Sequence, residues 1–203
     1  MRLPGSSARV GTPSTLLVLG LGNPGALYEG TRHNVGADAI HLLVKRHGGT
    51  LKVERHQRAQ LAEVTIAGKR VALAIPTTFM NESGAALRPL EKRTGVSLPK
   101  QLVVVHDELD LLPGVVRVKD GGGLAGHNGL RSIVAVLGDQ SFSRIRIGIG
   151  KPPSKEQGAT HVLSKLSKAA RQELDEAIVT AANAVELLVG EGLAPAMNAF
   201  NQS

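Results

Sequence analysis

The chain has 203 residues, of which 42% are apolar and 2% aromatic, and it contains no cysteine. This length is sufficient for one α/β domain with a sizeable core, and the lack of cysteine excludes disulfides, thiolate metal sites and a cysteine nucleophile. Lys and Arg outnumber Asp and Glu by 24 to 17. Such an excess is typical of proteins with a polyanionic partner, although plain solubility charge also explains it.

The N-terminal segment, residues 1–14, is rich in Pro, Gly and Ser and lacks the apolar core of a secretory signal. We expect it to be a disordered tail and residues 15–203 to form a single domain. No apolar run approaches the ~20 residues that a membrane span requires. The absence of cysteine fits a reducing cytoplasm.

The predicted elements alternate between strands and helices. In chain order they are a strand at 16–21, a helix at 36–47, a hairpin of strands at 60–66 and 70–75, a helix at 81–94, strands at 102–106 and 115–119, a glycine-rich loop at 121–129, a helix at 130–137, a strand at 144–149, a polar linker at 151–157 and an amphipathic helix at 167–189 closed by Gly190. This order predicts one α/β domain with a twisted, mostly parallel mixed β-sheet flanked by helices.

The first predicted strand runs into "GLGNPG" at 20–25, which matches the dinucleotide-binding pattern G-x-G-x-x-G. A nicotinamide or flavin enzyme would need a helix that starts at the third glycine. Gly30 and Gly36 disfavour such a helix, and Pro24 lacks an N–H for a phosphate. No acidic residue ends a second strand about 20 positions later. We therefore expect the turn to present side chains instead: Asn23, Tyr28, Arg32, His33 and Asn34.

The stretch "GLGNPGALYEGTRHNVG" is followed in order by "PTTFMNESG" at 76–84, "HDELDLLPG" at 106–114, "GHNGLRS" at 126–132 and "RIRIGIG" at 144–150. With these five motifs the chain resembles the bacterial peptidyl-tRNA hydrolase family from about Leu16 to Phe200. The resemblance implies a monomeric enzyme, without metal or cofactor, that cleaves the ester between a peptide and the 3′ CCA end of tRNA. The implied partner is peptidyl-tRNA, bound through its acceptor arm.

Ester hydrolysis at neutral pH needs a base that activates water and a group that orients the base. Histidine suits the first role, because its ordinary pKa of ~6.5 lies near working pH. Asp107 follows a buried strand, and ligand sites gather at the carboxyl ends of strands, so it is well placed to meet His33. From the residues alone, His33 could be a surface side chain and Asp107 a turn or helix cap. The resemblance implies a catalytic His33 oriented by Asp107.

Three asparagines stand in the motifs: Asn23, Asn81 and Asn128. Local sequence alone favours a turn for Asn23, a helix cap for Asn81 and a first helical turn for Asn128. Amides offer donors and acceptors without charge, so they also suit a site that holds water and an ester. The resemblance implies that all three line the site. It implies that Asn23 distinguishes a blocked amine from a free one and that Asn128 is a candidate for steadying water or the oxyanion.

The resemblance also implies that Tyr28 contacts the tRNA end and that Phe79 and Met80 flank the scissile ester. Phe79 could equally fill the core of this aromatic-poor chain. The 121–129 loop resembles a mobile loop over the cleft, and we expect a structural or substrate-contact role for His127.

Basic side chains alternate on two strands, where Arg117 and Lys119 share one face and Arg144 and Arg146 share another. Exposed basic stripes of this kind neutralise phosphates without reading sequence, although edge strands often carry such charge without a ligand. The resemblance points most firmly to Lys119 and Arg146 as tRNA contacts, with Arg117 beside them.

A non-catalytic RNA-binding relative of the same fold is the alternative function. Such a protein would need an added apolar patch for its partner and a transit peptide. The tail at 1–14 is short and has no amphipathic pattern, which disfavours this alternative.

Overall fold

The structure of the chain, a computed structural model, describes residues 12–202. Of the tail expected at 1–14, residues 1–11 lie outside the described part. Within it, Ser14 is buried and its N–H donates to the carbonyl of Thr94. No helix between residues 12 and 202 is both long enough and apolar enough to cross a membrane.

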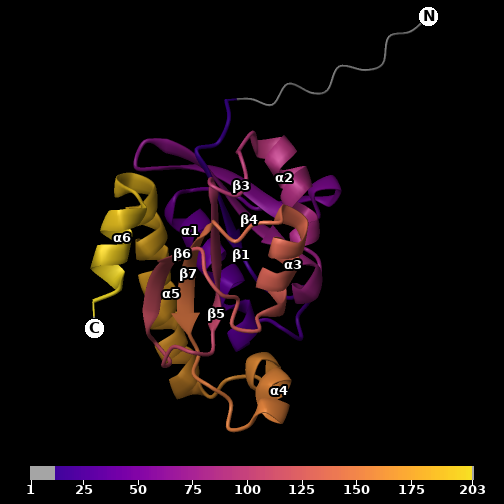
Figure 1. The fold of residues 1–203 in the computed structure, drawn as a ribbon, viewed down its shortest axis with the longest axis vertical. Helices are drawn as coiled ribbons and strands as arrows, with labels where there is room; N and C mark the ends of the chain where they lie inside the picture. Colours follow the sequence, from indigo (N-terminus) through magenta and orange to yellow (C-terminus); the bar gives the residue numbers. More distant parts are fainter. Residues whose placement is uncertain (1–11, 203) are drawn as a thin grey trace, which may run out of the picture.

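Seven strands in the described residues form one mixed sheet, which confirms the predicted fold class (Figure 1). The sheet order is β2-β3-β4-β1-β5-β7-β6, and β4, β1, β5 and β7 run parallel. The remaining pairs, β2–β3, β3–β4 and β6–β7, are antiparallel. The strands are β1 (Leu16–Gly20), β2 (Lys52–Glu54), β3 (Ala59–Ile66), β4 (Lys69–Pro76), β5 (Leu102–Glu108), β6 (Val116–Asp120) and β7 (Ser143–Gly148).

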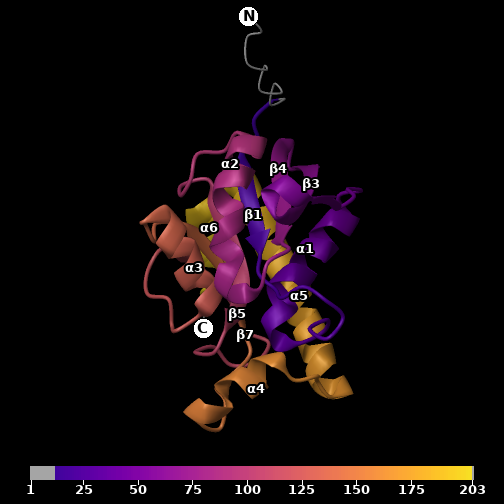
Figure 2. The same ribbon diagram turned by 90° about the vertical axis from the view of Figure 1, so that its right-hand side faces the viewer.

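Helices cover both faces of the sheet, and side chains that alternate along each strand divide the core between the faces. Val18 of β1 belongs to the cluster under α1 and α5, whereas its neighbours Leu17 and Leu19 belong to the cluster under α2 and α3. Figure 2 shows α2 and α3 together, with α1 and α5 running side by side. The helices are α1 (Val35–Arg46), α2 (Leu87–Thr94), α3 (Asn128–Leu137), α4 (Gly158–Leu163), α5 (Lys168–Glu191) and α6 (Leu193–Phe200), with 3₁₀ turns η1 (Arg32–Asn34), η2 (Arg55–Gln57), η3 (Met80–Ala86) and η4 (Lys155–Gln157).

The predicted elements are present, with differences at their ends. The segment predicted as one helix at 81–94 is η3 followed by α2, and α3 begins two residues earlier than predicted. The last long helix does not stop at Gly190; it continues to Glu191 and ends at Gly192, whose φ of 101° a β-carbon disfavours. The short elements β2, α4 and α6 were not predicted, because each has too few residues to establish a period.

Glycines bring α1 against the carboxyl ends of β1 and β5. A β-carbon at Gly36 would collide with the carbonyl of Val105, and one at Gly20 would collide with the carbonyl of Gly36. Gly20 and Gly36, the first and last glycines of the first motif, therefore serve helix–strand packing. α1 starts at Val35, ten residues after Gly25, which confirms the prediction that no helix opens at the third glycine of the pattern. His33 lies in the turn between Gly25 and α1, and this turn places it at the carboxyl end of β5.

Candidate active site

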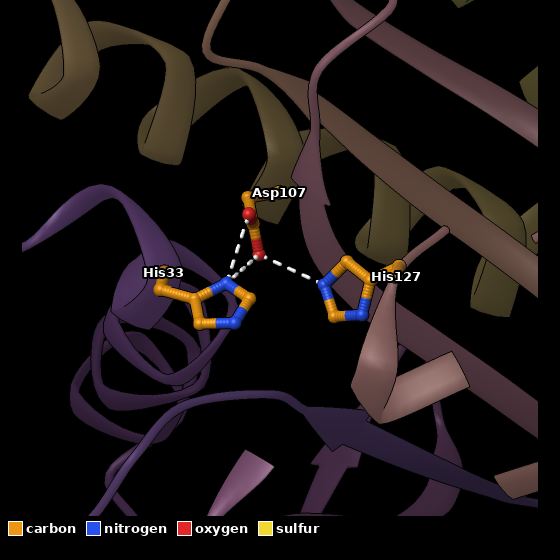
Figure 3. A group of neighbouring side chains, drawn as sticks. All are labelled: His33, Asp107 and His127. Atoms are coloured by element: carbon orange, nitrogen blue, oxygen red, sulfur yellow. Dashed lines mark hydrogen bonds and ion pairs between the residues drawn. The ribbon is translucent and has the colours of Figure 1, made fainter. Parts of the chain in front are cut away.

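Asp107, near the carboxyl end of β5, joins two histidines from distant parts of the chain (Figure 3). Nδ1 of His33 lies 2.9 Å and 3.0 Å from the two carboxylate oxygens of Asp107. Nε2 of His127 lies 2.9 Å from Oδ1 of the same carboxylate. The structure thus brings together His33 and Asp107, as the strand-end argument predicted, and adds His127.

The hydrogen bond to Asp107 determines which nitrogen of His33 is free. An ionised carboxylate only accepts, so Nδ1 of His33 carries the proton and donates it. In the neutral ring, Nε2 then holds a lone pair. His33 belongs to η1 and lines a cavity. This is the arrangement that a general base requires.

His127 uses both of its ring nitrogens within the fold. Its Nδ1 accepts the backbone N–H groups of Gly129 (3.1 Å) and Leu130 (3.3 Å) and so caps the N-terminus of α3. Because Nδ1 is the acceptor, the proton sits on Nε2, which donates it to Asp107. His127 therefore anchors the start of α3 to the carboxylate and has no free nitrogen for proton transfer.

The two donors keep Asp107 ionised although it is buried. Burial alone would raise the pKa of Asp107, but the facing rings of His127 and His33 hold it well below its usual range. A third histidine, His106, is fully buried beside them, and its Nδ1 donates to the backbone carbonyl of Asp107 at 2.7 Å. Burial lowers the pKa of His106 to about 3, with a further contribution from His127, so His106 stays neutral.

Asn34 holds Asn23 in place on the other side of His33. The side chain of Asn34 accepts the backbone N–H of Asn23 and donates to its carbonyl, both at 2.9 Å. Oδ1 of Asn23 in turn accepts the backbone N–H of Met80 at 2.8 Å. The amide of Asn23 is thereby oriented, with Nδ2 as its remaining donor. Asn34 was expected among the side chains that the turn presents; it is buried and positions Asn23 instead.

Asn81 and Asn128 lie at the same end of two adjacent helices. η3 and α3 pack closely and run in the same direction. Gly129, near the start of α3, lies against Met80 at the start of η3, and Gly84, further along η3, lies against Ser132, further along α3. Both asparagines are exposed. η3 has no side-chain cap, so the interpretation of Asn81 as a helix cap is wrong.

Tyr28 and Phe79 form an edge-to-face pair with ring centroids 6.3 Å apart. Phe79 is 51% exposed, so the alternative that it fills the core is wrong. Met80, the next residue, is buried against the helix layer, and its backbone is what holds Asn23. Phe79 is exposed and Tyr28 is half-buried, and Phe79 directly precedes Met80, whose N–H Asn23 binds.

A cavity of about 240 Å³ opens beside the paired residues. The polar His33 and Asp107 stand in its wall, and its other walls come from the end of β5, the loop before α3 and the helix α4. Its lining residues are His33, Asp107, Glu108, Leu109, Ala125, Gly126, His127, Asn128, Gly158, Ala159 and Val162. Figures 1 and 2 both place α4 at the lower end of the molecule, where it packs beside η1.

His33, Asp107 and His127 also have the residue types of a metal site, with one ligand atom each within 4.8 Å of the others. A metal at Nε2 of His127 would require the proton on Nδ1. That proton would face the N–H groups of Gly129 and Leu130, which are also donors. The three residues therefore fit a hydrogen-bonded network better than a metal centre.

The four strand-borne cations share one face of the sheet, because Arg117 pairs in register with Arg146 and Lys119 with Arg144. Arg144 is nevertheless only 1% exposed, so its expected place in an exposed stripe is wrong. Arg146 donates to Glu108 at 3.0 Å, and Glu108 is buried rather than solvated. Arg117 donates to the carbonyl of Phe200. Arg32, expected to be presented by the first turn, donates to the carbonyl of His161.

The comparisons with known proteins agree with one another. A model of the family described as peptidyl-tRNA hydrolase matches residues 17–203. The peptidyl-tRNA hydrolase of Mycobacterium sp. (strain KMS) is 48% identical over 183 residues, which cover 90% of this chain and 95% of that protein. That of Mycobacterium tuberculosis is 47% identical over the same shares. The crystal structure of peptidyl-tRNA hydrolase from Acinetobacter baumannii has a TM-score of 0.86 and 42% identity, covering 94% of this chain and 97% of that one.

Proposed function

The chain belongs to the peptidyl-tRNA hydrolase family, and from this premise we propose that it releases tRNA from peptidyl-tRNA through a water molecule activated by His33. The observation that supports this role is the bond of His33 Nδ1 to Asp107, which leaves Nε2 as a base beside the cavity. The relatives cited above are named as hydrolases, so the non-catalytic RNA-binding alternative is not favoured.

The proposed reaction needs one proton carrier. Nε2 of His33 takes a proton from water, and the oxygen of that water attacks the carbonyl carbon of the ester. The imidazolium formed is stabilised by Asp107, which remains ionised. When the carbonyl–oxygen bond to the ribose breaks, the departing 3′ oxygen takes the proton from His33. The products are tRNA with a 3′ hydroxyl and the peptide acid, which loses the second proton of the water to solvent and leaves as the carboxylate.

The asparagines and the aromatic pair would hold the two parts of the substrate. Asn23 is held so that its Nδ2 donor is unused by Asn34 and Met80, which suits it to a peptide carbonyl of an N-blocked substrate. Asn128 lines the cavity beside His33 and suits the water or the oxyanion, and Asn81 stands at the same helix end. Tyr28 and Phe79 offer faces on which the terminal bases of tRNA stack.

The acceptor arm of tRNA would lie along the basic face. Lys119, Arg146 and Arg117 share one side of the β6–β7 pair, where they can meet phosphates without reading sequence. We expect a monomer that works in the cytoplasm, where peptidyl-tRNA is formed, and that binds the 3′ CCA end at the aromatic pair.

The test is hydrolysis of an N-acetyl-aminoacyl-tRNA by the wild-type chain and by the His33→Asn variant, with unblocked aminoacyl-tRNA as control. The wild type should cleave only the blocked ester. The variant should lose at least ~10² in kcat, as expected for removal of a general base, while it still binds tRNA. A wild type that binds tRNA and cleaves nothing would contradict the proposed function.

A further inference from the structure

Arg144 is a buried cation that the proposed reaction does not use. It lies on β7, it is 1% exposed, and it makes no ion pair among the described residues. The acid on its face of the sheet, Glu108, is bound to Arg146 instead. Burial lowers the pKa of Arg144, with Arg146 contributing in the same direction, but an arginine remains charged in proteins. A buried charge without a carboxylate needs other partners.

The partners of Arg144 are three successive carbonyls of the glycine-rich loop. Its guanidinium donates to the carbonyls of Gly121, Gly122 and Gly123. Gly121 and Gly122 have φ angles of 54° and 86°, a region that favours glycine. This backbone turns all three carbonyls toward one side chain. Gly121 and Gly122 therefore allow the backbone conformation in which the loop carbonyls accept hydrogen bonds from the Arg144 guanidinium.

The loop is held at both ends, and between them Leu124 packs against the core cluster under α2 and α3. At the far end His127 is tied to Asp107 and to the first turn of α3. Between the two ties, Ala125 and Gly126 are exposed and line the cavity, and Ala125 has a φ of 47°, which a β-carbon disfavours. Such a backbone persists when its surroundings impose it. Arg144 supplies one of these constraints.

We propose that Arg144 is a positioning residue, which sets the conformation of the 121–126 loop and so the cavity wall beside His33 and Asp107. If the loop departed, the guanidinium would lose all three of its carbonyl acceptors at once. Because hydrogen bonds from a charged donor are stronger than neutral ones, Arg144 favours the observed conformation of the loop. Arg144 acts through the loop and does not itself contact a phosphate of tRNA.

The experiment compares Arg144→Met and Arg144→Lys with Lys119→Met, a variant of a proposed phosphate contact. Arg88→Met, which removes an exposed arginine of α2, controls for the loss of one cation. Hydrogen exchange of the peptide that spans 121–127 is measured for each variant. Then kcat and KM for N-acetyl-aminoacyl-tRNA are measured from 50 to 200 mM salt.

Arg144→Met should speed exchange of the loop about tenfold and leave α5 unchanged. Its kcat/KM should fall about tenfold, since a smaller share of the molecules has the competent loop, with the salt slope of the wild type. Lys119→Met should lower that slope by about 0.9 and leave loop exchange unchanged. Arg144→Lys should fall between wild type and Arg144→Met, because an ammonium lacks the planar fork of donors.

Loop exchange within about twofold of wild type in Arg144→Met would overturn the proposal, given the tenfold change expected for loss of a local constraint. A salt slope that falls as in Lys119→Met would also overturn it, because Arg144 would then be a phosphate ligand. If Arg144→Met does not fold, exchange in Arg144→Lys decides in the same way. The kinetic measurement rests on the proposed function, but the hydrogen-exchange measurement does not. A failure of the proposed role of Arg144 can therefore be distinguished from a failure of the proposed function.

Discussion

Two glycine-rich segments, the turn after β1 and the loop after β6, each bring a histidine to the same carboxylate. In the turn after β1, glycines let α1 approach the sheet. Successive backbone hydrogen bonds link Gly25, Tyr28, Thr31 and Asn34. His33 then binds Asp107 through Nδ1, which leaves Nε2 free beside the cavity. In the second, glycines turn carbonyls onto Arg144, and His127 arrives with its other nitrogen already bound to α3.

The difference shows that contact with Asp107 does not by itself identify the base. Both histidines lie 2.9 Å from Oδ1 of the carboxylate. What separates them is the second ring nitrogen, which is a cap in His127 and a free lone pair in His33. In the proposed mechanism, the turn after β1 therefore supplies the base and the loop after β6 supports it.

The largest effect should follow from Asp107→Asn, which removes the charge that both segments share. An amide no longer favours the proton on Nδ1 of His33 and no longer stabilises the imidazolium. We expect kcat to fall by about 10⁴, the loss that the same Asp-to-Asn change causes in a serine-protease triad. Steady-state hydrolysis of N-acetyl-aminoacyl-tRNA measures this, with far-ultraviolet circular dichroism to check the fold. A loss below about tenfold, less than general acid–base catalysis supplies, would contradict the role of the carboxylate.

A smaller effect should follow from Asn23→Asp within the turn after β1. The variant keeps the acceptor for the N–H of Met80 and replaces the donor Nδ2 by an oxygen. If Nδ2 binds a substrate carbonyl, kcat/KM should fall by about 10 to 10², the cost of an unpaired polar contact at the site. Asn183→Asp, at an exposed position of α5 where the side-chain oxygen also accepts a hydrogen bond, serves as the matched amide-to-acid control. Equal activity of Asn23→Asp and wild type would show that the donor is unused.

The last prediction concerns His106. Its substitution should affect activity least and should change the pH dependence of stability. Burial lowers its pKa to about 3, so between about pH 6.5 and pH 3 the unfolded chain binds a proton that the folded chain does not. Stability is therefore lost as the pH falls through this window, by roughly 1.4 kcal/mol per pH unit. Asp107, whose pKa is held low, loses its contribution only below its ordinary value of about 3.8.

Urea unfolding of wild type and His106→Gln at pH 6.5 and pH 4.5 tests this contribution. The variant should show a pH-dependent loss smaller by about 2 to 3 kcal/mol over the two units, whatever its absolute stability. Both pH values lie above about 3.8, below which protonation of Asp107 would also reduce the stability. The same pH dependence in both proteins would contradict the assignment.

The sequence predicted the sheet and the pair of His33 and Asp107, because carboxyl ends of parallel strands meet at one edge. It did not predict the supporting contacts. The alternation of side chains along β7 predicted the face on which Arg144 lies. That the 121–129 loop covers Arg144 on this face is seen only in the structure. Asn34 was missed as an anchor, whereas the structural role expected as one possibility for His127 is confirmed by its bonds to Asp107 and α3, although the cap itself was not predicted. "GHNG" before a helical run was a signal for a cap, yet histidine is an uncommon cap residue.

The central claim is that His33 is the base and His127 the anchor, and one matched pair of variants tests it most directly. His33→Asn and His127→Asn are assayed for kcat on N-acetyl-aminoacyl-tRNA, since asparagine keeps a cap at position 127 but cannot serve as a base at either position. We predict a loss of at least ~10² for His33→Asn and of no more than ~10 for His127→Asn. Equal losses, or a larger loss for His127→Asn, would contradict the account.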